Sequence, residues 1–302
     1  MTADATPQMQ MKSAAGTTVR SALRDAIAQL FAAGTPSHVL AAELLLMHAT
    51  GRDRAWIYAH PEAELSEQSA TNFFELITRR ASGVPTQYLT GKQEFWALEF
   101  EVTPAVLIPR PETEHVIEVV LERLRPRAVI GQLRVADVGT GSGCIAVALA
   151  KELPSAEIVA TDISAPALEV ARRNAERHGV SHRVLFVVCD LLQGAARDAA
   201  GFDVVVSNPP YVARAKESEL AREVREHEPR IALFGGATGT EIYDRLIAQA
   251  AQHLRAGGLL VMEISFGVAQ RMREMLDDQL WNDIRVTNDL AGIPRVISAV
   301  RK

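Results

Sequence analysis

The clearest chemical signal in the chain is the stretch SNPPYV at residues 207–212. Its two adjacent prolines end an apolar, strand-like run abruptly, because proline lacks a backbone donor and restricts the residue before it. The carbonyls remain, so Asn208 Oδ1 and the Pro209 carbonyl are two fixed hydrogen-bond acceptors. Two acceptors suit one –NH₂ group, because hydrogen bonds to both of its N–H groups fix the direction of the nitrogen lone pair. Pro210 completes the turn, and Tyr211 offers a flat face for a planar amide or base.

A glycine-rich turn follows an earlier apolar run, in the segment VADVGTGSGCIAVALA. Its pattern is D-x-G-x-G-x-G, beginning at Asp137, and it brings backbone N–H groups and a helix N-terminus close to a ligand. A dinucleotide fold needs glycine at position 144, where this chain has Cys144. An acid fits poorly beside a pyrophosphate and well beside an ammonium group. The turn residues expected to contact the ligand are Gly139, Thr140, Gly141, Ser142 and Gly143.

A second acid completes the expected ligand site. Asp162 ends the next apolar run, about 20 residues beyond the glycine turn, where an acid binds ribose hydroxyls. An adenosine with a cationic amino-acid tail satisfies both Asp137 and Asp162, and that ligand is S-adenosylmethionine. Here the sequence resembles the class I methyltransferases, which release S-adenosylhomocysteine. The resemblance implies that Asp190 and Leu191 flank the adenine and that Asn208 also contacts the cofactor.

The position of the SNPPYV turn indicates the reaction. It follows the fourth strand of this region, which we expect beside the first strand, at the switch point of the sheet where ligands bind. The turn would face the methyl group, and an in-line displacement mainly requires a positioned lone pair, without a strong base. The motif is similar to that of amino methyltransferases, which act on planar –NH₂ groups of adenine, cytosine or glutamine. The motif indicates the reaction class and leaves the substrate open.

Periodicity places these motifs in the second of two predicted domains. Residues 1–16 are small and polar without a period, which predicts a disordered tail. Residues 17–84 have helical spacing in three stretches and predict a small helical domain. Residues 85–113 predict a β-hairpin, with a turn at Gly91-Lys92, and a proline-rich linker. Residues 114–302 alternate strands with helices, which predicts an α/β, doubly wound, mostly parallel seven-stranded methyltransferase sheet.

Whole-chain composition limits the partners and the compartment. The formal net charge of -5 argues against a broad basic surface, so no direct nucleic-acid binding is expected. Cys144 and Cys189 form no disulfide framework. No secretory signal or bilayer-spanning apolar run is evident, so we expect a cytoplasmic monomer that does not bind membranes. His115, His178 and His182 lack metal-ligand spacing, and no metal is expected.

The whole chain resembles the release-factor glutamine methyltransferases, the PrmC/HemK family. The resemblance implies methylation of N5 of the glutamine in the Gly-Gly-Gln motif of class I peptide-chain release factors. It also implies that residues 208–211 bind that glutamine and that the helical domain docks the release factor. The chain departs from the family pattern at Ala97, where glycine is expected, and at residues 265–266 and 293–294. The matching segments are AAELLLMHATG, GVPTQYLTGKQEFW, VLIPRPETE, DVGTGSGCIAVALA, SNPPYV, HEPRIALFGG, GTEIYDRLI and DLAGIPRV.

Three alternatives stay open at this point. A glutamine methyltransferase that acts on a ribosomal protein would share the same core motifs. An adenine-N6 nucleic-acid methyltransferase would need a basic target-recognition region and a pocket for a flipped base. A non-catalytic adaptor would bind cofactor only for stability, and the intact Asn208 turn argues against it.

Two charged segments each have two possible roles. Arg110, Glu112 and Glu114 in IPRPETE either close over the site or form a solvated connection. Glu228 either lines a substrate channel or pairs with Arg230.

Overall fold

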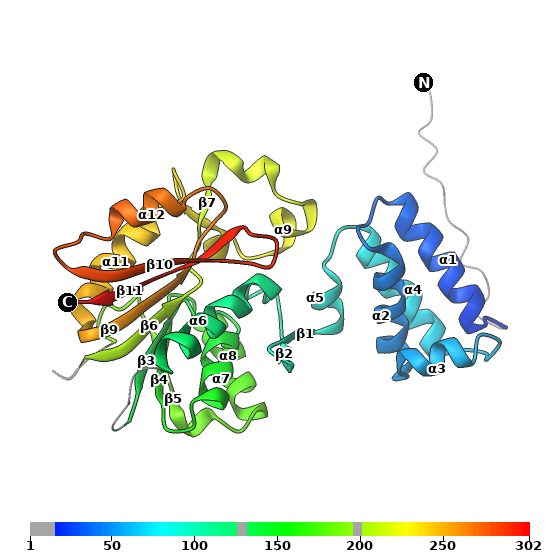
Figure 1. The fold of residues 1–302 in the computed structure, drawn as a ribbon. Coiled ribbons are helices and arrows are strands. Elements are labelled where there is room, and N and C mark those ends of the chain that lie inside the picture. Colours follow the sequence, from blue (N-terminus) through cyan, green and yellow to red (C-terminus); the bar gives the residue numbers. More distant parts are fainter. Residues whose placement is uncertain (1–15, 126–131, 196–200) are drawn as a thin grey trace. The chain divides into compact units, whose positions relative to one another are not determined.

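The computed structural model describes residues 16–125, 132–195 and 201–302 (Figure 1). The chain divides into two compact units, which meet in sequence between Thr90 and Gly91. The tail predicted at residues 1–16 lies outside the described residues, apart from Gly16.

The N-terminal unit is a helical bundle around a core that includes Leu30, Leu46 and Phe73. The three predicted helices are confirmed, and Ser66 caps the third, since its Oγ accepts the Ser69 N–H at 3.2 Å. Two short helices were not predicted, because they are too short to display a hydrophobic period. The helices are α1 (Val19–Ala32), α2 (His38–Thr50), α3 (Arg54–Ala59), α4 (Glu67–Ala81) and α5 (Thr86–Thr90).

An antiparallel hairpin opens the second unit, formed by β1 (Lys92–Phe95) and β2 (Leu98–Glu101). Its turn lies at Trp96 and Ala97, so the turn predicted at Gly91-Lys92 was wrong. Both turn residues have a φ of 54°, a left-handed conformation that favours glycine. Because the turn contains Trp96 and Ala97 and no glycine, the sequence does not mark it, and the turn was predicted at the nearest glycine, Gly91.

A seven-stranded sheet forms the centre of the second unit, in the order β10-β11-β9-β6-β3-β4-β5 (Figure 1). The strands from β9 to β5 are parallel, while β11 runs antiparallel to β9 and to β10. The predicted doubly wound, mostly parallel sheet is confirmed, including the neighbouring positions of its first and fourth strands. The strands are β3 (Arg134–Val138), β4 (Glu157–Asp162), β5 (Val184–Val188), β6 (Phe202–Ser207), β9 (Leu254–Glu263), β10 (Trp281–Asn288) and β11 (Pro294–Arg301).

Helices cover both faces of this sheet, because successive strand residues point to opposite faces. Val204 joins the core beneath α6, α7 and α8, whereas Val205 joins the core beneath α11 and α12. Of these helices, α6 and α12 were not predicted. The helices are α6 (Glu114–Leu124), α7 (Cys144–Glu152), α8 (Ala165–Arg177), α11 (Glu241–His253) and α12 (Ala269–Met275).

A small parallel pair of strands, β7 (Val212–Ala213) and β8 (Phe234–Gly236), lies at the end of the SNPPYV turn. This pairing returns the segment after α10 to the turn. The remaining short elements are η1 (Pro111–Thr113), η2 (Ser181–Arg183), η3 (Arg214–Glu219), α9 (Arg222–His227) and α10 (Arg230–Leu233).

Candidate active site

A pocket opens at the carboxyl ends of β3, β4 and β6 in the second unit. The glycine turn, Asp162 and the SNPPYV turn are far apart in the sequence. They meet here because parallel neighbouring strands end at one edge of a sheet. The predicted site residues that line the pocket are Gly139, Thr140, Gly141, Ser142, Asp162, Asp190, Leu191, Asn208 and Pro210.

Four predicted site residues do not line the pocket: Asp137, Gly143, Pro209 and Tyr211. Asp137 is fully buried and Pro209 is also buried. Gly143 packs against α8, where an added Cβ would lie 3.0 Å from the Ala171 Cβ. Each of them adjoins the lining, since Gly143 follows Ser142, Pro209 and Tyr211 flank Pro210, and the Asp137 carboxylate accepts the Thr140 hydroxyl.

Two carboxylates hold the glycine turn. Asp137 Oδ2 accepts the Thr140 hydroxyl at 2.6 Å and the Ala146 N–H at 3.0 Å. Asp162 Oδ2 accepts the Gly141 N–H at 2.9 Å, and its Oδ1 accepts the Ser164 N–H at 2.8 Å. Each predicted ligand-binding acid thus also fixes the backbone of the turn beside it.

One of the two Asp137 carboxylate oxygens is not satisfied by the part of the protein that the structure describes. Its Oδ1 is buried and has no hydrogen-bond partner among the described residues. Burial raises the pKa of Asp137 from its ordinary 3.8 to about 7. A buried polar atom without a partner is costly in a folded protein, and a cationic group placed here would satisfy it. The site therefore fits the ammonium group of the cofactor predicted from the sequence.

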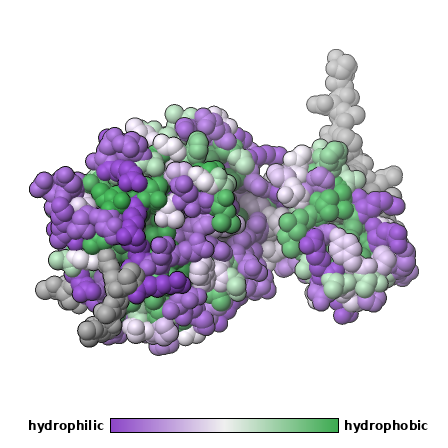
Figure 2. All heavy atoms as spheres, in the orientation of Figure 1, coloured by the Kyte–Doolittle hydropathy of each residue, from purple (hydrophilic) through white to green (hydrophobic). Residues whose placement is uncertain are grey.

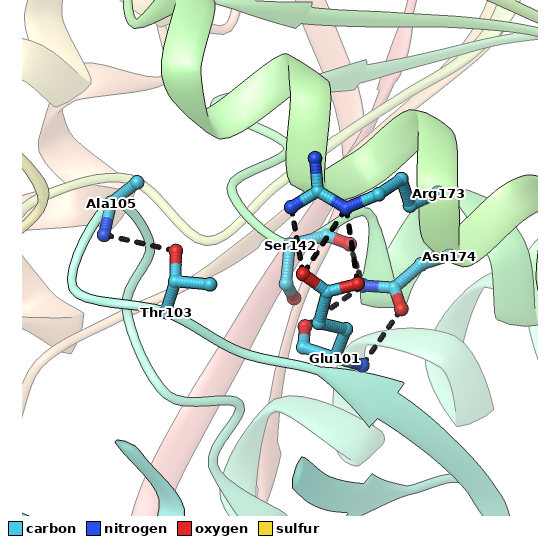
Figure 3. A network of polar contacts seen from close by, with 6 residues as sticks. All are labelled: Glu101, Thr103, Ala105, Ser142, Arg173 and Asn174. Carbon is cyan, nitrogen blue, oxygen red and sulfur yellow. Dashed lines mark hydrogen bonds and ion pairs between the residues drawn. The ribbon is translucent and has the colours of Figure 1, made fainter. Parts of the chain in front are cut away.

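Figure 3 shows how the glycine turn is fastened to the hairpin. Asn174 on α8 is fully buried, and its Nδ2 donates to the Ser142 carbonyl at 2.9 Å and to the Glu101 carbonyl at 3.0 Å. Its Oδ1 accepts the Glu101 N–H at 2.7 Å. The Arg173 guanidinium bonds to the Glu101 carboxylate at 2.7 Å and lowers the pKa of that carboxyl. One side chain therefore joins the turn to the strand that leads to Ala105 on the pocket wall.

The SNPPYV turn is anchored by two residues that the sequence interpretation missed. Asn208 Nδ2 donates to Thr113 Oγ1 at 3.0 Å, and the Thr113 hydroxyl donates to Glu263 Oε2 at 2.6 Å. The Tyr211 hydroxyl donates to Glu263 Oε1 at 3.2 Å. One signal could have identified Glu263, since an acid in the apolar strand GLLVMEI is rarely buried without a partner.

Two glycines form a close wall behind the same turn. A Cβ on Gly235 would lie 2.5 Å from the Pro210 carbonyl oxygen, and one on Gly239 would lie 2.5 Å from the Tyr211 carbonyl oxygen. Real Cβ atoms do not approach backbone so closely, so only glycine fits at either position. The segment that contains β8 thus determines where the backbone of residues 210–211 can lie.

The structure decides between some of the roles considered for the IPRPETE segment and for Glu228. The Glu228 carboxylate is buried, pairs with the Arg110 guanidinium on the pocket wall and accepts the Ile108 N–H at 3.3 Å. Burial raises the pKa of Glu228. The predicted alternative pairing of Glu228 with Arg230 was wrong, because Arg230 pairs with Glu217.

The neighbouring acids have different positions. Glu114 accepts the Trp96 N–H at 2.7 Å and so supports the left-handed hairpin turn. At the predicted adenine end, the Asp190 carboxylate pairs with the Arg245 guanidinium, and both residues line the pocket.

The sheet order, the glycine turn and the SNPPYV turn at the switch point are those of a methyltransferase. The fold resembles a T. thermophilus 16S rRNA N2 G1207 methyltransferase, RsmC, solved with AdoMet and guanosine. That likeness has a TM-score of 0.51 and 20% identity, and it covers 70% of this chain and 50% of that chain. The hMettl16 catalytic domain bound to MAT2A 3'UTR hairpin 1 gives a TM-score of 0.55 at 19% identity, covering 74% of this chain and 80% of that chain. These likenesses concern the fold alone.

Sequence comparison identifies the family. A family model described as the PrmC N-terminal domain matches residues 21–91, and one described as the methyltransferase small domain matches residues 114–231. The chain is 48% identical over 280 residues to a release factor glutamine methyltransferase of Koribacter versatilis, covering 93% of this chain and 97% of that relative. It is 44% identical over 286 residues to one of Moorella thermoacetica, covering 94% and 99%. The chain therefore belongs to the release factor glutamine methyltransferases, and the predicted family is confirmed.

Proposed function

We propose that this chain transfers a methyl group from S-adenosylmethionine to N5 of the glutamine in the Gly-Gly-Gln motif of class I peptide-chain release factors. The names of its relatives support a release factor as the substrate. The observation that carries the chemistry is the Asn208 amide, whose Nδ2 is held by Thr113 at the pocket wall. Its Oδ1 has no hydrogen-bond partner among the described residues and remains available to a substrate –NH₂ group.

The pocket residues support S-adenosylmethionine as the methyl donor. Asp137 Oδ1 would accept the ammonium group, and Asp162 keeps acceptor capacity for ribose hydroxyls beyond its two backbone bonds. Asp190 and Leu191 would flank the adenine. When bound, the cofactor supplies an electrophilic methyl group on a sulfonium centre.

The catalytic turn positions the nucleophile. Asn208 Oδ1 and the Pro209 carbonyl would accept both N–H bonds of the substrate amide, which weakens its conjugation and aims the nitrogen lone pair. The ring of Tyr211 would pack against the planar amide, with its hydroxyl held by Glu263. Positioning supplies most of the rate acceleration in such a displacement, and the extra proton leaves after transfer.

The N-terminal unit is the proposed docking surface for the release factor. Figure 2 shows hydrophobic residues, in green, on the visible face of this unit. Phe31 is 68% exposed, and Val39, Leu40 and Leu44 on α2 are also exposed. Exposed apolar groups on a small bundle favour contact with a protein. No helix within the described ranges is long and apolar enough to cross a membrane. A release-factor substrate supports a cytoplasmic location.

A labelling experiment tests the proposed function. The protein is incubated with methyl-labelled S-adenosylmethionine and, separately, with a class I release factor, ribosomal protein or DNA. We expect label on the release factor alone, and none on a release factor whose Gly-Gly-Gln glutamine is replaced by alanine. Label on DNA, or on ribosomal protein in preference to release factor, would refute the proposal.

A further inference from the structure

An asparagine amide has an acceptor end and a donor end of nearly the same shape. The proposed reaction needs the acceptor end of Asn208 to face the substrate. With the amide reversed, its own N–H groups would meet the N–H groups of the substrate. We propose that Thr113 and Glu263 are positioning residues that select the productive orientation of the Asn208 amide. This inference rests on the proposed role of Asn208.

The selection follows from the number of protons available. The Thr113 hydroxyl has a single hydrogen, and its Oγ1 lies 2.6 Å from Glu263 Oε2. An ionised carboxylate only accepts hydrogen bonds, so the Thr113 hydrogen is directed to Glu263. Oγ1 can then only accept from Asn208, which lies at 3.0 Å. The amide must therefore present Nδ2 to Thr113 and Oδ1 away from it.

The three residues come together because of the fold. Ser207 on β6 is paired with Met262 on β9, so Asn208 and Glu263 lie at the ends of adjacent parallel strands. Thr113 immediately precedes α6, a position where threonine commonly caps a helix. Its side chain makes no capping hydrogen bond and contacts Glu263 instead.

Glu263 acts on both side chains of the catalytic turn. It is 2% exposed, and each carboxylate oxygen holds one donor, the Thr113 hydroxyl on Oε2 and the Tyr211 hydroxyl on Oε1. Burial raises its pKa, while these two hydrogen bonds and the positive charge of Arg295 oppose the rise. The Tyr243 hydroxyl donates to the Glu263 backbone carbonyl at 3.1 Å and fixes the strand end. The carboxylate thus orients the amide of the turn and its aromatic ring together.

Two nearly isosteric substitutions test the proposal. Glu263→Gln introduces an –NH₂ group that donates to Thr113 or Tyr211, and in the first case the Thr113 hydrogen is free to donate to Asn208 Oδ1. Thr113→Val removes the hydroxyl at almost constant volume. We expect kcat for release-factor methylation to fall about 100-fold in each variant, the range for losing one preorganised polar contact. The KM for release factor and the S-adenosylmethionine affinity measured by calorimetry should change less than about threefold.

Thr113→Ser is the matched control, because it keeps the hydroxyl. It should recover most of the activity that Thr113→Val loses. A kcat within about twofold of wild type in both Glu263→Gln and Thr113→Val would overturn the inference while leaving the proposed function intact. A raised KM at unchanged kcat would also overturn it, because the network would then serve docking. A wild-type protein that labels no release factor would instead count against the proposed function.

A measurement on the unsubstituted protein covers the case in which a variant fails to fold. Nuclear Overhauser contacts from the Asn208 side-chain amide protons to the Thr113 methyl group are expected. Amide protons of Asn208 that are remote from Thr113 would show the reversed orientation and refute the inference.

Discussion

The two turns of the pocket are built differently. The glycine turn is held by Asp137 near the end of β3, by Asp162 at the end of β4 and by Asn174 on α8. The SNPPYV turn is held from remote parts of the chain, by Thr113 before α6, by Glu263 at the end of β9 and by glycines after α10. The cofactor side is thus mostly supported within consecutive β-α units. The substrate side depends on elements brought together only by the folded sheet.

The largest expected effect is on the substrate side. Asn208→Ala removes the proposed acceptor for the substrate amide, and kcat should fall roughly 100- to 1000-fold, as for other preorganised polar groups. Single-turnover methylation of release factor measures this loss. Cofactor affinity should change far less, and an equal loss in both quantities would remove the distinction between the two turns.

The second largest effect is expected at Gly235, which packs closely behind the SNPPYV turn. Gly235→Ala places a Cβ 2.5 Å from the Pro210 carbonyl oxygen, so the turn must shift. A displacement near 1 Å at a reacting centre costs about 100-fold in rate. Gly292→Ala is a stringent control, because its φ of 77° adds a backbone strain that Gly235 does not have, whereas its Cβ would meet nothing within 4 Å. Similar kcat values for the two variants would show that the wall does not position the turn.

The third prediction concerns the glycine turn, and it is tested by measuring S-adenosylmethionine affinity as a function of pH. The pKa of Asp137 is about 7 because burial disfavours the carboxylate, whereas an ammonium ligand favours it. S-adenosylmethionine affinity should therefore weaken as pH falls, about tenfold between pH 8 and pH 6 by calorimetry. Asp137→Asn should bind with little pH dependence. Unfolding of the cofactor-free protein should show the opposite trend, because a raised carboxyl pKa makes the native state lose stability as pH rises from about 4 to 7.

The smallest expected effect lies outside the pocket, at the hairpin. Ala97 has a φ of 54°, so Ala97→Gly should raise the free energy of unfolding by about 0.5 to 1 kcal/mol in chemical denaturation. Ala221→Gly is the control, because Ala221 is exposed with a φ of -52° and gains nothing from glycine. Methylation activity should stay within about twofold of wild type in Ala97→Gly, since Ala97 belongs neither to the glycine turn nor to the SNPPYV turn.

Much of the second unit was predictable from the sequence for a physical reason. Strands such as β3 and β6 are short, mostly apolar and mostly buried runs, which indicate a buried parallel sheet, and a glycine or proline follows each run within two residues. The helix caps at Ser66 and Ser164 are local, since each accepts a backbone N–H three residues ahead. Local signals of this kind do not depend on the rest of the chain.

The predictions that were wrong depended on contacts between residues that are remote in the sequence. The hairpin turn at Trp96-Ala97 was misplaced because Glu114, a remote residue, supports a backbone conformation that its own residues disfavour. A Glu228–Arg230 ion pair was considered because the two residues are close in the sequence. In the folded chain Glu228 pairs with Arg110, and Arg230 pairs with Glu217. Partner choice between charged side chains is set by spatial distance, which sequence separation does not report.

The sequence by itself therefore determined the reaction class and the parallel sheet, and it singled out Asp137, Asp162 and Asn208 as candidate site residues, because these depend on residue type and local spacing. Only the tertiary structure decided which way the Asn208 amide points. That orientation depends on Thr113 and Glu263, which lie 95 residues before Asn208 and 52 residues after Tyr211 in the sequence. A directional hydrogen-bond chain requires atoms within about 3 Å of one another. Adjacent strand ends supply that proximity here.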